Sequence, residues 1–310
     1  MISLIQLGTV DYATGLQLQQ QLVALRKEEK IGDVLLLLEH NPVITLGRNA
    51  KAANVVASPE LLASRGVELF ECDRGGDVTF HGPGQIVGYP IFDLRVHANT
   101  SVSSSRAEEN GSKSRSLQSR DLAFRKHIGV IEFVRRLEEV LIRTCADFSI
   151  PSKRLPGLTG VWTDPASLSS RAKENDSKNR SLESRDPAFT GVTTEHVGTA
   201  ASAVQQSEAS CSDDNAECKL AAIGVHISRF VTSHGFALNV NTDLSYFALI
   251  VPCGITTKPV TSMRRELGKP LDLNVVAESI SRNFGTVFSS QMLWVETLDA
   301  LLSRAVGVRV

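Results

Sequence analysis

The feature that most limits how this chain can fold is a repeat within its polar segments. The run SSRAEENGSKSRSLQSRDLAF at 104–124 recurs with few changes as SSRAKENDSKNRSLESRDPAF at 169–189. Both copies are rich in Ser, Arg, Lys and Glu, so they cannot bury enough apolar surface to offset the entropy lost on ordering. We therefore expect disordered insertions at 98–126 and 165–216. The rest of 1–310, about 230 residues, is an ordinary size for one domain.

The overall composition is that of a globular protein, with 42% hydrophobic residues, 22% charged residues and a formal net charge of -1. Nucleic-acid binding usually requires a strong basic excess, so no nucleic-acid partner is expected. The longest apolar run, Val34–Leu38, is far shorter than the roughly 20 residues of a membrane helix and predicts a buried strand. The start, MISLIQLGTVDY, lacks the basic and apolar regions of a secretory signal. We expect a cytoplasmic protein that does not enter membranes.

The cysteines are odd in number and irregularly spaced: Cys72, Cys145, Cys211, Cys218 and Cys253. This pattern argues against a disulfide framework and predicts at least one free thiol. The spacing of Cys211 and Cys218 fits no common zinc motif, so no metal site is expected.

Hydrophobic periodicity predicts strands and helices that do not alternate in the regular way of a doubly wound fold. Strands are expected at 3–7, 33–38, 43–46, 67–71, 220–227 and 235–240, the last two separated by a turn near Ser233. Helices are expected at 11–29, 58–66, 127–148, 273–288 and 298–305. Ser58 and Thr297 are in position to cap two of these helices. The predicted class is α+β (mixed α/β), with a mixed central sheet flanked by helices.

The most unusual segment is RGGDVTFHGPGQ at 74–85, where four glycines and a proline interrupt a pair of strands. Glycine lets the backbone approach a ligand closely, because it has no side chain and tolerates positive φ. A tight glycine turn beside a bulge explains the same composition without a ligand. The run matches neither the phosphate-loop nor the dinucleotide-binding pattern.

Two further positions attract attention. Lys219 begins the apolar run KLAAIG, where an edge lysine that protects the strand from aggregation is the simpler interpretation. Cys253 lies between Pro252 and Gly254 in VPCGI, a turn-prone loop that suits an accessible nucleophile. The competing interpretation of Cys253 is an inert packing residue.

Together these segments resemble the signature of the lipoyl(octanoyl) transferase family. The family pattern RGGxxTxHxPGQ matches 74–85 at every fixed position. Its lysine-led strand, its HGxALN run and its PCG triplet match KLAAIG at 219–224, HGFALN at 234–239 and PCG at 252–254. Weaker similarities are EHNPVITLGR at 39–48, YPIFDL at 89–94 and PGLTGVWTD at 156–164. The resemblance covers nearly all of the core but not the polar repeats.

The resemblance implies a single catalytic domain of the biotin/lipoate protein ligase and transferase type. Its activity would be an acyltransferase reaction, the first step of endogenous protein lipoylation. Octanoyl would pass from octanoyl-acyl carrier protein to the acceptor lysine of lipoyl domains, those of 2-oxoacid dehydrogenase E2 subunits and of the glycine-cleavage H protein. No cofactor, metal or nucleotide is implied.

The resemblance also implies roles for individual residues. Cys253 would be the nucleophile that carries the acyl group as a thioester, and Lys219 would lower the pKa of its thiol and transfer protons. The remaining matched positions would bind substrate: Arg74, Gly75, Gly76, Asp77, Val78, Thr79, Phe80, His81, Ala222, Ile223, Gly224, Gly235, Phe236 and Ala237. Whether Lys219 acts mainly as a cation or as a general base stays open. His81 and His234 are either bases or, as the resemblance favours, structural or pocket-lining residues.

Two other functions compete with this hypothesis. An ATP-dependent lipoate or biotin protein ligase would share the scaffold but activate a free acid as an adenylate, a reaction that does not use Cys253. A binding protein that uses the Ser/Arg-rich repeats is the non-enzymatic alternative. Each repeat mixes acids with bases, so its expected affinity for phosphate groups is weak.

Overall fold

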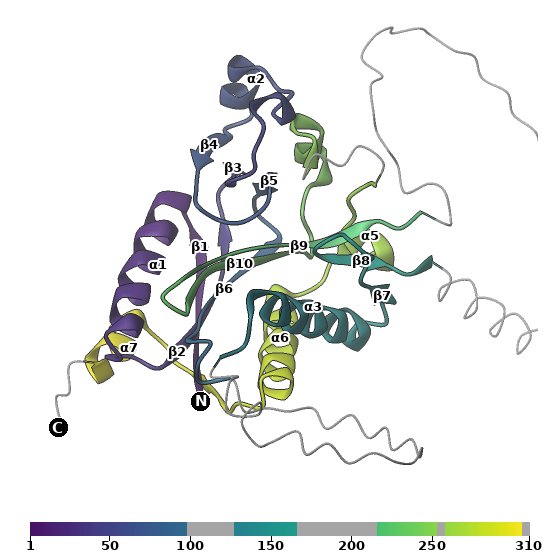
Figure 1. Ribbon diagram of the computed structural model, residues 1–310. Coiled ribbons are helices and arrows are strands. Elements are labelled where there is room, and N and C mark those ends of the chain that lie inside the picture. The colour runs from purple at the N-terminus through teal and green to yellow at the C-terminus, as the bar shows by residue number, and fades with distance from the viewer. Residues whose placement is uncertain (98–126, 166–215, 253–257, 306–310) are drawn as a thin grey trace, which may run out of the picture.

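The computed structural model describes residues 1–97, 127–165, 216–252 and 258–305. Most of its elements are labelled in Figure 1. Cys253 and nearly all of the two polar insertions lie outside the described residues, so the expectations for them remain predictions.

The larger sheet is mixed, with the strand order β11-β1-β2-β6-β10-β9-β8-β7. β1 runs parallel to both β2 and β11, and the other neighbours are antiparallel. Its strands are β1 (Ile2–Val10), β2 (Asp33–His40), β6 (Gln85–Ile91), β7 (Ser152–Lys153), β8 (Val161–Thr163), β9 (Lys219–Ser228), β10 (Val231–Asn239) and β11 (Met292–Trp294).

A smaller sheet projects beyond one end of the larger one (Figure 1). Its order is β4-β3-β5, with β3 parallel to β4 and antiparallel to β5. Its strands are β3 (Val43–Leu46), β4 (Glu68–Glu71) and β5 (Val78–His81). The short helix α2 (Pro59–Ser64) and the 3-10 turns at Ala52–Asn54 and Leu244–Leu249 lie beside it.

Helices cover both faces of the larger sheet (Figure 1). α1 (Tyr12–Lys27) and α7 (Leu298–Ala305) pack on one face, and α3 (Val130–Asp147) and α6 (Leu273–Val287) pack on the other. The short helix α5 (Met263–Leu267) follows the segment that borders β9. The predicted α+β class, with a mixed sheet flanked by helices, is confirmed.

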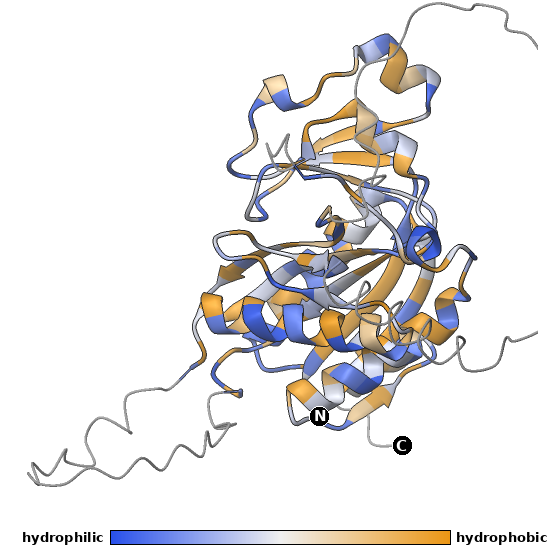
Figure 2. Cartoon of the chain, turned by 90° about the vertical axis from the view of Figure 1, so that its right-hand side faces the viewer, coloured by the Kyte–Doolittle hydropathy of each residue, from blue (hydrophilic) through white to orange (hydrophobic). Residues whose placement is uncertain are grey.

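The apolar run in β2 explains why this strand is central. Leu35 and Leu37 face the α3 and α6 side, whereas Leu36 and its neighbours at two-residue spacing face α1. Because strand side chains alternate between faces, a continuous apolar run is what a strand covered on both sides requires. Figure 2 shows hydrophobic residues along the strands and alternating hydrophobic and hydrophilic residues along the helices. Within the described residues, no helix is long and apolar enough to cross a membrane.

Both predicted helix caps are confirmed. The Ser58 hydroxyl accepts a hydrogen bond from the Leu61 amide at 3.3 Å, and the Thr297 hydroxyl accepts one from the Ala300 amide at 3.1 Å. The expected free thiols are also present, at Cys72 and Cys145. Cys218, in contrast, is disulfide-bonded.

The turn between β9 and β10 differs from the prediction. It lies at Arg229 and Phe230, which both have positive φ, of 50° and 68°. Ser233 instead lies within β10, where it pairs with His226. A tight hairpin requires a left-handed backbone at its central residues. Arg and Phe are not typical of this conformation, so the turn was wrongly predicted at the Ser-His-Gly run that begins at Ser233.

Candidate functional site

The Arg74–Asp77 loop is held between the turn after β3 and the middle of β9. The amides of Arg48 and Asn49 donate to the carbonyls of Arg74 and Gly76 at 3.0 and 3.1 Å, and the Gly75 amide donates to the Val225 carbonyl at 3.1 Å. A Cβ atom at Gly224 would lie 2.6 Å from the Gly75 carbonyl oxygen. The close approach of loop and strand therefore requires glycine at this position in KLAAIG.

Arg74 is the buried cation of this loop, with 8% of its surface exposed. Its guanidinium donates to the Thr45 carbonyl at 2.6 Å and hydroxyl at 2.9 Å, and to the Gly75 carbonyl at 3.1 Å. Among the described residues no carboxylate forms an ion pair with Arg74. The side chain thus contributes positive charge to the site while neutral oxygens fix its position.

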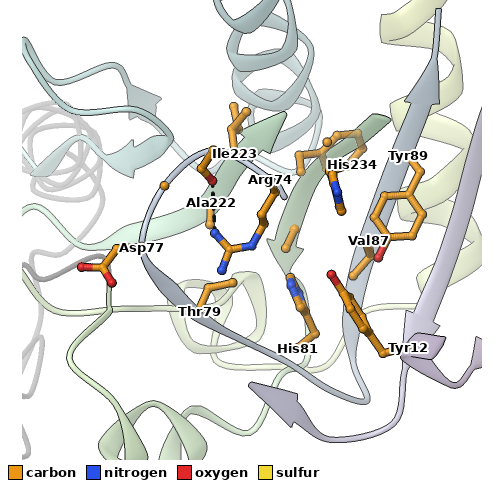
Figure 3. A pocket seen from close by; sticks show the side chains of 16 residues that line it. Tyr12, Arg74, Asp77, Thr79, His81, Val87, Tyr89, Ala222, Ile223 and His234 are labelled. Carbon is orange, nitrogen blue, oxygen red and sulfur yellow. Dashed lines mark hydrogen bonds between the residues drawn. The ribbon is translucent and has the colours of Figure 1, made fainter. Parts of the chain in front are cut away.

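These segments enclose a pocket, which we call the chamber, shown in Figure 3 with the side chains of 16 lining residues. All but two of the predicted substrate-binding residues line it: Arg74, Gly75, Gly76, Asp77, Thr79, His81, Ala222, Ile223, Gly224, Gly235, Phe236 and Ala237. That they bind substrate remains a prediction.

The two exceptions are Val78 and Phe80, which belong to the core of the smaller sheet with Ile44. Successive side chains of β5 point to opposite faces, so Thr79 and His81 face the chamber while Val78 and Phe80 face away from it. Their placement makes them packing residues rather than lining residues.

Three lining residues were missed in the sequence: Tyr12, Val87 and Tyr89. Tyr12 begins α1, far from the matched motifs in sequence, whereas Val87 and Tyr89 lie on β6, directly after the glycine-rich run. Tyr12 stacks on His81 with ring centroids 6.3 Å apart. The Tyr89 hydroxyl donates to His40 Nε2 at 2.6 Å, and burial raises its pKa well above the ordinary value. His234, which the sequence left as a possible lining residue, also lines the chamber.

His81 is held as a neutral imidazole. Its Nδ1–H donates to Gln85 Oε1 at 2.8 Å, and the Gln85 amide donates in turn to Asn239 Oδ1 at 2.8 Å. Burial, reinforced by the neighbouring His40 and Arg74, lowers the pKa of His81 to about 3. The ring therefore presents an unprotonated Nε2, which lies 3.5 Å from the Thr45 hydroxyl.

A second, smaller cavity adjoins the chamber and contains Lys219. The two cavities share the small side chains of Thr79, Ala222 and Ala237. Pro252 and Val260 line the smaller cavity with Lys219. The sequence thus predicted two sites, Lys219 and the glycine-rich run, that the fold places side by side.

Lys219 is buried between neighbouring strands, with 7% of its surface exposed. Its Nζ lies 5.2 Å from the centroid of the Trp162 ring, a cation–π distance. A Cβ atom at Gly160 would lie 2.9 Å from Lys219 Cε, so glycine at 160 leaves room for the lysine stem. The interpretation of Lys219 as a solvated edge residue is therefore wrong.

The backbone of Lys219 is joined to the chain that follows position 257. The Lys219 amide donates to the Pro259 carbonyl at 2.8 Å, and the Thr261 amide donates to the Lys219 carbonyl at 3.0 Å. Asn239 extends this connection, because its amide donates to the Thr261 carbonyl at 3.0 Å. Within the described part of the chain, no group of three or more His, Cys, Asp or Glu side chains is arranged to hold a metal ion.

Comparison with known proteins shows the family to which the chain belongs. The family model described as Lipoyl protein ligase A/B catalytic domain matches residues 11–110 and 122–285. The chain belongs to this family. Its relatives include the octanoyltransferase of Koribacter versatilis, 51% identical over 97% of this chain and 90% of the relative. The octanoyltransferase of Acidobacterium capsulatum is 45% identical over 97% of this chain and 96% of the relative.

These relatives place the chain among the octanoyltransferases of the family, and so among the acyltransferase enzymes. Solved structures support the fold. A bipartite lipoate protein ligase from Thermoplasma acidophilum superposes with a TM-score of 0.54 at 11% identity, covering 98% of this chain and 89% of that chain. A lipoate-protein ligase A bound with ATP gives 0.55 at 10% identity, covering 98% and 93%. The ligase-type catalytic fold expected from the sequence is confirmed.

Proposed function

We propose that this octanoyltransferase takes octanoyl from octanoyl-acyl carrier protein and delivers it to the acceptor lysine of lipoyl domains through a thioester on Cys253. The observation that carries the proposal is the path of the chain around Lys219. Pro252, which directly precedes Cys253, and Val260 both line the cavity that contains Lys219. The described chain on both sides of the segment that bears the cysteine therefore lies beside the lysine.

This position suits Lys219 to activate the thiol. An unperturbed thiol, with a pKa near 8.5, is only a few per cent thiolate at neutral pH. Lowering that pKa by two units requires about 2.7 kcal/mol of preferential stabilisation of the thiolate. A buried ammonium in a partly apolar cavity is able to supply this energy, because its charge is poorly screened there.

The proposed reaction has two balanced steps. The Cys253 thiolate attacks the carrier thioester carbonyl, a new carbon–sulfur bond forms, and the carrier thiolate leaves and takes up a proton. The acceptor lysine, as a neutral amine, then attacks the enzyme thioester, and an amide forms as Cys253 is released. The Lys219 ammonium holds the first thiolate and gives its proton to the departing carrier thiolate. The neutral Lys219 amine then accepts the proton that the incoming amine loses, and release of the Cys253 thiolate restores the original pair.

The chamber suits the hydrocarbon part of the substrate. It adjoins the Lys219 cavity at Thr79, Ala222 and Ala237, whose small side chains line both cavities. Backbone amides of the glycine-rich run supply hydrogen-bond donors for the thioester oxygen. The acceptors expected are lipoyl domains of 2-oxoacid dehydrogenase E2 subunits and of the glycine-cleavage H protein, in the cytoplasm and without a cofactor.

Mapping the acyl adduct tests the nucleophile. The purified protein, kept reduced because Cys218 forms a disulfide, is incubated with octanoyl-acyl carrier protein and digested for mass spectrometry. We expect an octanoyl adduct on Cys253 that hydroxylamine removes. Cys72→Ser is the matched control, since Cys72 is a half-buried free thiol outside the chamber. An adduct on another residue contradicts the proposal.

A pH titration of thiol reactivity tests Lys219. We expect Lys219→Ala to raise the apparent pKa of Cys253, because the neighbouring positive charge is lost. Lys258→Ala is the control, because the Lys258 ammonium is paired with Glu217 and does not line the Lys219 cavity. An unchanged thiol pKa in Lys219→Ala excludes the activating role. Full activity of Cys253→Ser with ATP and free octanoate would instead support the ligase alternative.

A further inference from the structure

The chamber extends along the β9–β10 hairpin away from Lys219. Ala222 is paired with Ala237, and Gly224 with Gly235, so these four residues line successive levels of it. Three residues of strand, from Lys219 to Ala222, span about 10 Å. An extended chain of eight carbons with bonds of about 1.5 Å spans about 9 Å. An octanoyl group with its carbonyl beside Lys219 therefore spans the Lys219 cavity, enters the chamber at Ala222 and points toward His234.

His234 separates the chamber from a third cavity, on the side away from Lys219. This cavity, which we call the outer groove, lies between α1 and the hairpin, and its lining includes Leu16, Gln19, Val23, His226 and Ser233. Among the described residues, His234 alone lines both the chamber and the outer groove. The chamber is narrow, about 50 Å³, whereas the outer groove is about 450 Å³. One side chain thus divides a confined space from an open one.

Three constraints hold the His234 ring in this position. Its Nε2–H donates to Asp73 Oδ1 at 2.7 Å, and its backbone amide donates to Gln19 Oε1 at 2.7 Å. Its φ is 56°, in the left-handed region that residues other than glycine rarely adopt. Only 3% of the residue is exposed. A left-handed backbone persists at such a residue only where its surroundings hold it, and here the two hydrogen bonds and the burial also fix the position of the ring.

We propose that His234 is the end wall of the acyl chamber and sets the longest chain that the enzyme accepts. The inference rests on the proposed octanoyl transfer and adds the specificity determinant for chain length. Five residues of β9, from Lys219 to Gly224, span about 17 Å, and His234 pairs with the next residue, Val225. A chain of twelve carbons spans about 14 Å and one of sixteen about 19 Å. Hexadecanoyl chains therefore meet the His234 ring, and removal of the ring gives them a path into the outer groove.

His234→Gly is the decisive variant. Glycine adopts a φ of 56° without strain, keeps the amide that donates to Gln19, and removes the ring. The assay compares kcat/KM for hexadecanoyl- and octanoyl-acyl carrier protein. We expect the ratio to rise at least tenfold over wild type in His234→Gly. A smaller rise is expected in His234→Asn, since asparagine tolerates the left-handed region but keeps a short side chain.

His226→Ala is the matched control. His226 also faces the Asp73 carboxylate, at 3.5 Å, but lines only the outer groove. It is expected to keep the wild-type ratio. An unchanged ratio in both His234 variants, with octanoyl transfer preserved, overturns the end wall and leaves the proposed function intact. An equal rise in His226→Ala also overturns it, because loosening of Asp73 would then be the cause. Absence of octanoyl transfer by the wild-type protein refutes the proposed function, and the inference with it.

Discussion

Gln85 is the best place to test whether the hydrogen-bond network behind the chamber contributes to stability. It is 2% exposed, accepts from His81 Nδ1 at 2.8 Å, and donates to Asn239 Oδ1 at 2.8 Å and to the Phe80 carbonyl at 3.2 Å. Gln85→Met keeps a similar shape but leaves a buried donor on His81 and buried acceptors on Asn239 and Phe80 without their partner. Each such orphaned group costs about 1–3 kcal/mol. Partial relaxation leads us to expect a loss of about 3–4 kcal/mol.

Urea unfolding at pH 7.0 and 25 °C measures this loss, provided that the m-value is unchanged. Gln20→Met is the control, because Gln20 lies exposed on α1 and its replacement is expected to change stability by less than about 0.5 kcal/mol. A loss below about 1 kcal/mol in Gln85→Met would show that the network is weaker than its geometry suggests.

Three further predictions concern His81, Asp33 and Gly224. The imidazole of His81 should stay neutral in NMR titrations from pH 8 to pH 5, because burial lowers its pKa to about 3; a midpoint near 6.5 would contradict this. Burial alone would raise the pKa of Asp33, but hydrogen bonds from His97 and the Asp93 amide outweigh it and lower the pKa below 3.8. The stability that Asp33 contributes is thus complete above about pH 4 and is lost as the pH falls below it. In thermal melts, Asp33→Asn should reduce the fall in melting temperature between about pH 4 and lower pH. Gly224→Ala should reduce octanoyl transfer more than tenfold and destabilise by about 1–3 kcal/mol, since its Cβ would lie 2.6 Å from the Gly75 carbonyl. Gly32→Ala, with nothing within 4 Å, should behave as wild type in both assays.

Features with a local physical signal were predictable from the sequence. The caps at Ser58 and Thr297 and the buried strand at Val34–Leu38 follow from side chains and spacing within a few residues. The exclusion of Val78 and Phe80 from the chamber follows from the alternation of side chains along β5, a strand that the sequence analysis did not predict. The family pattern counted every residue of the run equally and so included both.

Features that depend on distant pairings were not predictable. Tyr12 and Tyr89 reach the chamber because α1 packs on β10 and β6 pairs with β10, and no local pattern reports either contact. The left-handed residues Arg229 and Phe230 carry no turn signal of their own. Cys253 lies outside the described residues and its role stays a prediction; Pro252, the residue before it, lines the cavity that contains Lys219.

The β9–β10 hairpin carries Lys219, part of the chamber lining and the end wall His234. The distances between these three parts are therefore set by the pairing of the two strands. The tight turn at Arg229 and Phe230 fixes which residues of β9 and β10 face one another. An insertion of one residue in that turn would move the small residues at Ala222 and Ala237 out of register. The fit to an acyl chain would then change without any alteration to a residue that touches it.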